Sequence, residues 1–326
     1  MKIGKTILRR GFTLVELMTA MAITSILVFI ILQLTNQAVD LWKGVTQDVS
    51  TTTRSRSALQ SMSHDMESFQ MRAGDNKYEW LFAVADDAVK GVPKGLSIPK
   101  SAHCVFFACP PDRNPSVSSS VSLRSNYREA RAHNRDTQGD VTAISYRLMY
   151  RDQILNLPGT EKGEVGAYPL FSLYRHVVPP RTTFDTLLGK DNLAGAYSVY
   201  AGEDEKKFLC ENILEMNLEF TVRYPAGKAD AKKGRVAYKT VSVPVVSSRN
   251  KTHKVRVFGD RVEVDGTTYE NARIVAANIS ITVVTEEGMA LINQIRLGRR
   301  RAPKAAEFFS RYTRSFARKV NMPYPL

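Results

Sequence analysis

The chain has 326 residues, of which 43% are hydrophobic and 24% charged, and its formal net charge is +14. This is the composition of a globular protein, long enough for one large domain or two small ones. The three cysteines form no CxxC pair, which excludes a disulfide scaffold and zinc-finger spacing. A basic surface permits contact with nucleic acid, anionic lipid or acidic protein, and selects none of them.

Residues 12–34 form an apolar segment, FTLVELMTAMAITSILVFIILQL, in which Glu16 is the only charge. As a helix rising about 1.5 Å per residue, the segment is long enough to cross a bilayer. Four cations precede it, Lys2, Lys5, Arg9 and Arg10, and the flank that follows is neutral overall. The positive-inside rule therefore predicts a cytoplasmic N-terminus with the bulk of the chain outside. No small-residue cleavage site follows the segment, which argues against an ordinary secretory signal.

A plain membrane anchor does not explain Glu16. A charged side chain costs about 2.5–3.5 kcal/mol near the centre of a membrane helix on insertion scales. Such a residue is a candidate functional site, and a lone carboxylate in lipid needs a cation as its partner.

The stretch GFTLVELMTAMAITSILV resembles the prepilin motif of type IV pilins and type II secretion pseudopilins. The resemblance implies that residues 1–11 are a leader peptide and that a prepilin peptidase cuts between Gly11 and Phe12. It also implies that Phe12 is then N-methylated. Glu16 would be the fifth mature residue, and its partner the terminal amine of a neighbouring subunit. Major pilins usually have a proline later in the segment, where this chain has Gln33, so the resemblance is closer to a minor subunit.

Helical spacing continues beyond the apolar segment. Leu59, Met62, Met66 and Phe69 recur in steps of three and four, and Gly74 begins a plausible stop. We therefore expect one helix from Phe12 to about Arg72. Its membrane-spanning part is residues 12–34, and residues 35–73 form its extramembrane half, which lays the Leu59–Phe69 stripe on a globular head.

After Gly74 apolar residues tend to recur at every second position instead of at helical spacing. This pattern predicts a β-rich head over residues 74–285. The predicted strands lie at residues 78–85, 102–109, 141–150, 168–178, 213–224 and 272–285, with weaker ones at 233–243 and 252–266, the last containing an FGDR turn. The fold class is therefore α+β, with the long helix packed on an antiparallel sheet. The head resembles, at the level of pattern only, that of J-type minor pseudopilins and W-type minor pilins.

Composition predicts two loops within the head. Residues 110–140 are rich in serine and arginine and form a loop insertion, and residues 184–205 form a second loop.

Residues 286–326 form a basic C-terminal tail, which we expect to be helical because Ala306, Phe309, Tyr312 and Phe316 recur at roughly helical spacing. Its candidate anion-binding residues are Arg299, Arg300, Arg301, Arg311, Arg314 and Arg318. The tail could bind nucleic-acid phosphates, an anionic membrane surface or an acidic partner subunit. It could equally be a solvated helix docked by Phe309 and Phe316.

The sequence contains no recognisable catalytic set and no metal-ligand spacing, so we expect neither an enzyme nor a cofactor. Cys104 and Cys109 are a candidate disulfide if they lie outside the cytosol, and otherwise buried thiols. Three acidic residues lie close together in the sequence, Asp260, Glu263 and Asp265. They could form a loose cation site, but we favour a strand edge held by salt bridges.

Together these features predict a minor pilin-like or pseudopilin subunit, assembled into a type IV pilus-like or type II secretion filament at or near its tip. Its expected partners are the prepilin peptidase, other pilin subunits and the inner membrane. The protein would cross that membrane once, with its head periplasmic or extracellular. The alternative is a membrane-anchored DNA-binding or adhesion pilin that uses the Arg-rich loop and the basic tail.

Overall fold

The computed structural model describes residues 13–74, 77–86, 89, 92–93, 95–96, 98–110, 141–152, 168–200, 208–226, 237–247 and 251–323. Gly11, Phe12 and nearly all of the predicted loop insertion 110–140 therefore lie outside the described residues. The chain divides into two compact units, residues 1–50 and residues 51–326. Helix α1 (Leu14–Glu67) contributes to both, and each unit is described by itself.

The first unit is the N-terminal part of α1, and every described side chain in it is exposed. The helix is continuous through Gly44 and Gln33, as expected from the absence of proline. It ends at Glu67, earlier than predicted. Phe69 is buried as expected, but it lies beyond the helix, where it forms an isolated bridge with Ala108.

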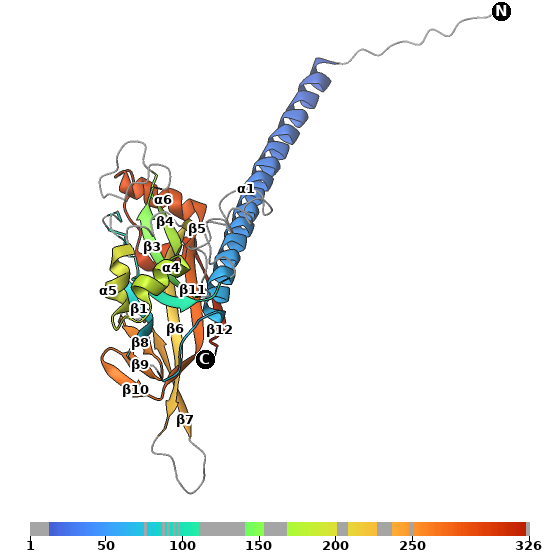
Figure 1. Ribbon diagram of the computed structural model, residues 1–326. Coiled ribbons are helices and arrows are strands. Elements are labelled where there is room, and N and C mark those ends of the chain that lie inside the picture. Colours follow the sequence, from blue (N-terminus) through green and yellow to red (C-terminus); the bar gives the residue numbers. More distant parts are fainter. Residues whose placement is uncertain are drawn as a thin grey trace, which may run out of the picture. The chain divides into compact units, whose positions relative to one another are not determined.

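The second unit is built on two antiparallel sheets (Figure 1), which confirms the α+β prediction. The larger sheet has the order β10-β9-β8-β1-β2-β3-β4-β5, with strands β1 (Glu79–Asp86), β2 (Ser101–Ala108), β3 (Thr142–Arg151), β4 (Leu170–Val177), β5 (Phe208–Glu211), β8 (Val255–Phe258), β9 (Arg261–Val264) and β10 (Thr267–Glu270). The smaller sheet has the order β12-β11-β6-β7, with β6 (Ile213–Pro225), β7 (Tyr238–Pro244), β11 (Arg273–Val284) and β12 (Thr313–Asn321).

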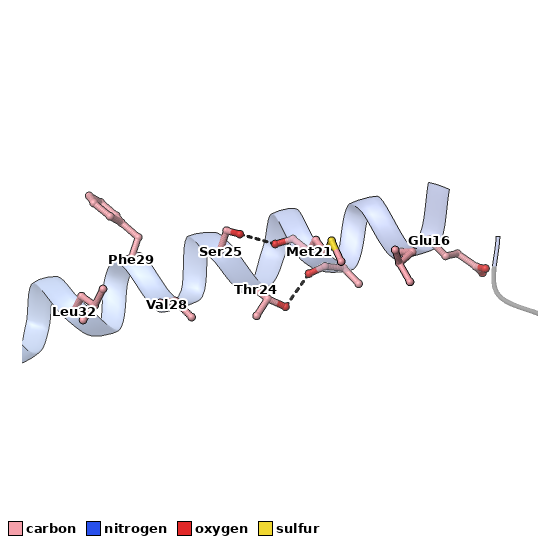
Figure 2. A pocket seen from close by; sticks show the side chains of 9 residues that line it. Glu16, Met21, Thr24, Ser25, Val28, Phe29 and Leu32 are labelled. Carbon is pink, nitrogen blue, oxygen red and sulfur yellow. Dashed lines mark hydrogen bonds between the residues drawn. The ribbon is translucent and has the colours of Figure 1, made fainter. Parts of the chain in front are cut away.

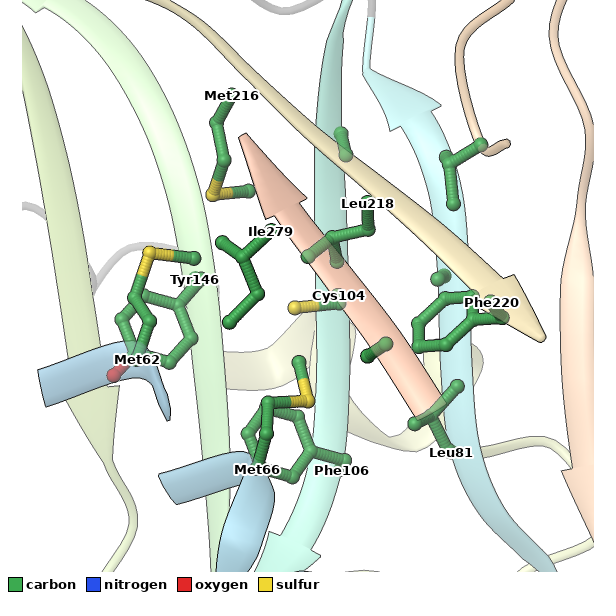
Figure 3. Close-up of a cluster of buried hydrophobic side chains, with 14 of the residues drawn as sticks. Met62, Met66, Leu81, Cys104, Phe106, Tyr146, Met216, Leu218, Phe220 and Ile279 are labelled. Carbon is green, nitrogen blue, oxygen red and sulfur yellow. The ribbon is translucent and has the colours of Figure 1, made fainter. Parts of the chain in front are cut away.

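The main core lies between the two sheets and the last turns of α1. Met62 and Met66 are fully buried against side chains from both sheets (Figure 3), including Phe106 and Tyr146 of the larger sheet and Leu218 of the smaller one. This confirms that the helix packs on the head through its predicted stripe. Burying side chains of this size contributes about 1.5–3 kcal/mol each, so these turns of α1 are an integral part of the head.

The other face of the larger sheet is covered by short helical turns, where the sequence predicted a loop. They are α4 (Pro180–Thr182), a π-helical turn (Thr183–Leu187), α5 (Leu193–Tyr197) and a 3-10 turn (Ser198–Tyr200). Leu187, Leu193 and Tyr197 are buried on Val105 and Phe107 of β2. Because the central strands are covered on both faces, their sequences are nearly continuous runs of apolar residues rather than alternations of apolar and polar residues.

The C-terminal segment closes one end of the unit and corrects the prediction of a helical tail. It contains α6 (Glu286–Arg296) and α7 (Ala305–Tyr312), whose Phe308 is buried against α6. The chain then enters β12, which pairs with β11 along its whole length, from Val284↔Thr313 to Ala276↔Asn321. The helical spacing at Phe316 was misleading, because this segment pairs with the edge of β11, where Phe316 packs against the main core, and such tertiary contacts override local propensity.

Of the two alternatives for Cys104 and Cys109, the structure has the thiols and not the disulfide. Cys104 lies in β2 and Cys109 directly after it, so about 16 Å of extended chain separates them, whereas bridged Cα atoms lie about 4.4–6.8 Å apart. Burial raises the pKa of the Cys104 thiol to about 12, and burial likewise raises that of Cys210 to about 11.

A buried ion pair fixes the end of α1 to the larger sheet. Arg175 of β4 donates to Asp65 from Nε at 2.7 Å and from Nη2 at 2.9 Å, and the Tyr146 hydroxyl donates to Asp65 Oδ2 at 2.5 Å. The Asp65 side chain is only 3% exposed. One turn into the second unit, Arg54 pairs with Glu211 of β5, but this pair is far more exposed.

We predict that Asp65→Asn destabilises the second unit by about 3–5 kcal/mol, because it removes the buried carboxylate that accepts two hydrogen bonds from the Arg175 guanidinium and one from the Tyr146 hydroxyl. Arg54→Gln, which removes the exposed pair, is the matched control and should cost less than about 1 kcal/mol. Urea unfolding of the full chain in neutral detergent measures both changes. Equal unfolding midpoints for the two variants would contradict the assignment of Asp65 as the main attachment of the helix.

We also predict that the three cysteines differ in reactivity toward a thiol reagent at pH 8. The thiolate is the nucleophile, and a pKa of about 12 leaves Cys104 ionised in about one molecule in ten thousand. Partly exposed Cys109 should be modified in the native protein, and Cys104 and Cys210 only after denaturation. Peptide mass spectrometry reads the sites, and labelling of native Cys104 at the rate of Cys109 would show that the core placement is wrong.

Candidate functional site

The N-terminus of α1 is closed by a reciprocal pair of contacts between Thr13 and Glu16. The Glu16 backbone N–H donates to Thr13 Oγ1 at 3.2 Å, and the Thr13 N–H donates back to Glu16 Oε2 at 3.0 Å. The Thr13 hydroxyl also donates to Oε2 at 3.0 Å. This is a capping box, in which two side chains satisfy two otherwise unpaired N–H groups of the first turn.

The capping box places the Glu16 carboxylate at the positive end of the helix dipole, directed back along the chain. Glu16 was predicted as a site residue from its charge, and its role in the capping box was not predicted. The spacing Thr-x-x-Glu before an apolar run was the signal that could have revealed it. Among the described residues, Glu16 forms no ion pair, so its charge is stabilised only by neutral donors.

The remaining polar side chains near Glu16 bond to the helix itself. Thr24 donates to the Ala20 carbonyl and Ser25 to the Met21 carbonyl, each at 2.8 Å (Figure 2). Thr19 likewise donates to carbonyls of the preceding turn. Hydrocarbon offers no hydrogen-bond partners, so a spanning helix must satisfy its polar groups internally, and these hydroxyls do so. Glu16 is then the one charged group of residues 14–34.

The surface around Glu16 is apolar and uncovered. Figure 2 shows Val28, Phe29 and Leu32 along the helix beyond Ser25, and Phe29 is 63% exposed. An 18-residue window of α1 has a mean hydropathy of 2.3, and none of it is buried. Among the described residues, α1 is the single helix long and apolar enough to cross a membrane. Such a surface requires lipid or other helices around it.

The apolar surface extends beyond the predicted membrane boundary. Leu41, Trp42, Val45 and Val49 are exposed, and Trp42 is 75% exposed. Their spacing of three and four residues places most of them along one side of the helix. The head buries a later stripe of α1, which includes Met62. The stripe around Trp42 is therefore a separate surface that belongs to the first unit.

The six candidate anion-binding arginines lie on three consecutive segments of the chain. Arg299, Arg300 and Arg301 lie in the exposed loop between α6 and α7, Arg311 lies on α7, and Arg314 and Arg318 lie on β12. The part of the chain that the structure describes contains no group of three acidic, histidine or cysteine side chains placed to hold a metal ion.

The acidic residues near β9 form the salt-bridged edge that the sequence favoured over a cation site. Glu263 pairs with Arg256 at 3.4 Å and with Arg261 at 3.3 Å. Asp265 accepts from His253 Nδ1 at 2.6 Å and from the Lys254 N–H at 2.8 Å. The pKa of Asp265 is lowered by these contacts, against the opposing effect of burial.

Comparison with known proteins gives one match. Residues 8–32 match the family model of the prokaryotic N-terminal methylation motif, which covers the predicted cleavage site, Phe12 and Glu16. No curated protein and no solved structure matches the chain. The motif and the single apolar helix support a type IV pilin-like or pseudopilin-like precursor that is processed by a prepilin peptidase, assembles with other pilins and is anchored in a membrane by one span.

Proposed function

We propose that the protein is a minor pilin-like or pseudopilin subunit that enters a type IV pilus-like or type II secretion filament at or near its tip. The observation that carries the proposal is the methylation motif at residues 8–32, with Glu16 as the lone charge on an exposed apolar helix. The subunit acts by assembly rather than by catalysis. Before assembly, α1 holds it in the inner membrane with its N-terminus cytoplasmic and its head on the far side.

Processing creates the cation that Glu16 lacks. Cleavage between Gly11 and Phe12 frees an amine on the residue directly before the capping threonine, Thr13. In a filament, the Glu16 carboxylate of one subunit pairs with the amine of its neighbour. A carboxylate and an ammonium attract strongly in a medium of low dielectric, and the pairing offsets the cost of holding either charge in lipid. The leader prevents this pairing until it is removed.

The exposed stripe around Trp42 provides the second part of the assembly surface. Once the charge pair has set the register of two helices, Leu41, Trp42 and Val45 pack against neighbouring helices beyond the bilayer. Two further features favour a minor subunit over a major one. Gln33 replaces the proline usual in major pilins, and α1 continues through it. The described part of the head also contains two antiparallel sheets, in a chain about twice as long as a typical major pilin.

Substitutions at Glu16 and Thr13 separate the effect of the Glu16 charge on assembly from the effect of the helix cap. Glu16→Gln keeps a side chain that can complete the capping box but removes the charge. We expect this variant to be inserted and cleaved normally, yet to be lost from filaments by tenfold or more. Thr13→Ala removes the cap at a cost of about 0.5–2 kcal/mol and keeps the charge, so it should still be incorporated.

The readout is the amount of each cleaved variant that is cross-linked to other pilin subunits in cells, relative to the cleaved total. Normal cross-linking of Glu16→Gln would contradict the charge-pairing step. Loss of cross-linking in Thr13→Ala alone would mean that the cap, and not the charge, controls assembly.

A further inference from the structure

The C-terminal elements carry a concentration of positive charge that the assembly function does not use. We define the C-terminal basic surface as Arg299, Arg300, Arg301, Lys304, Arg311, Arg314, Arg318 and Lys319. All eight side chains are exposed, and Glu307 is the one acidic residue between the first and the last of them. The surface occupies the loop after α6, the helix α7 and the edge strand β12.

These cations have no acidic partners among the described residues. Arg311 lies over the ring of its neighbour Tyr312, and Arg314 donates to the Thr313 carbonyl, but neither contact neutralises the charge. Elsewhere in the same unit arginines are matched with carboxylates, as in the pair of Arg147 with Asp86 at 2.7 Å. Within the described part of the chain, the charge of the C-terminal basic surface is therefore uncompensated, and a polyanion would relieve its self-repulsion.

The surface is held by a rigid scaffold. Buried Phe308 fixes α7, the Thr285 N–H donates to the Tyr312 carbonyl at 2.9 Å, and β12 is paired with β11 over nine residues. Residues four apart on a strand point to the same side, so Arg314 and Arg318 form a row about 13 Å long. The cations thus lie on three consecutive segments of the chain, the loop at Arg299, α7 and β12, with Lys319 on the other side of β12 from Arg314 and Arg318.

The composition of the C-terminal basic surface indicates which kind of anionic partner it fits. Among residues 297–323, Leu297 is the one large apolar side chain that is exposed. A protein interface needs a buried apolar or aromatic centre with few charges, and a membrane-inserting surface needs an apolar face. Six of the eight cations are arginines, whose planar guanidinium groups bind phosphate in a bidentate manner. Interfaces with nucleic acid have this strongly positive, polar character.

We propose that the C-terminal basic surface binds the phosphate backbone of nucleic acid without reading its base sequence. This inference goes beyond assembly, because it concerns the head alone and does not require the subunit to enter a filament. Phosphate contacts of this kind make affinity fall steeply with salt, since each neutralised phosphate releases a counter-ion.

The test uses the full chain in neutral detergent and a labelled DNA duplex of about 30 base pairs, with binding followed by fluorescence anisotropy between about 50 and 200 mM salt. The first variant combines Arg299→Gln, Arg300→Gln and Arg301→Gln in the exposed loop. Its matched control combines Arg56→Gln, Lys190→Gln and Lys239→Gln, three exposed cations outside the surface. Both variants lose the same net charge, and thermal melting checks that both remain folded.

We expect the wild-type chain and the control to bind the duplex with similar affinity. The loop variant should bind about tenfold or more weakly, and the slope of log affinity against log salt should decrease by about 3. Failure of the wild-type chain to bind, or equal weakening of the control, would overturn the proposal. Competition by poly-L-glutamate at equal charge would instead indicate an acidic protein, and loss of binding in micelles that contain phosphatidylglycerol would indicate lipid headgroups.

Discussion

The pairing of polar groups within α1 is the constraint on which the rest of this molecule depends. A helix in hydrocarbon cannot leave donors or acceptors unsatisfied, and the hydroxyls of Thr24 and Ser25 bond to the helix that carries them. What remains is Glu16, whose carboxylate is held by the neutral donors of Thr13. Because Glu16 forms no ion pair among the described residues, the helix satisfies its hydrogen bonds internally while its one charge is held only by neutral donors.

The same helix is also a structural element of the head. Its last turns place Met62 and Met66 in the main core, and Asp65 forms the buried pair with Arg175. The earlier stripe around Trp42 remains available, since the head buries a different set of residues.

Much of this fold follows from local patterns. The long helix, most of the strands that line the core and the turn between Phe258 and Arg261 were predicted, because apolar periodicity reports burial directly. The short strand β5, which carries buried Cys210, was not predicted. The strand β10 was missed, although the Asp265-Gly266 turn before it, with positive φ at both residues, is a hairpin signal. The strand β12 was beyond local reasoning, since its basic sequence becomes a strand only beside β11.

The important residues of the molecule were likewise predictable only where they leave a local pattern in the sequence. Glu16 was found because a charge in an apolar run is conspicuous, and its capping partner Thr13 had a readable spacing. The Asp65–Arg175 pair joins residues 110 positions apart and leaves no local signal. The sequence left a disulfide and two thiols open for Cys104 and Cys109, and the structure has the thiols, because sequence proximity does not imply spatial proximity in an extended strand.

The central claim is that processing creates the amine which Glu16 requires, and the N-terminus of the mature protein tests this most directly. We expect intact-mass and peptide mass spectrometry of protein purified from membranes to show a chain that begins at Phe12 and carries one methyl group on its amine. A chain that retains residues 1–11, or that begins beyond the apolar segment, would contradict the account, because Glu16 would then have no newly formed cation beside it.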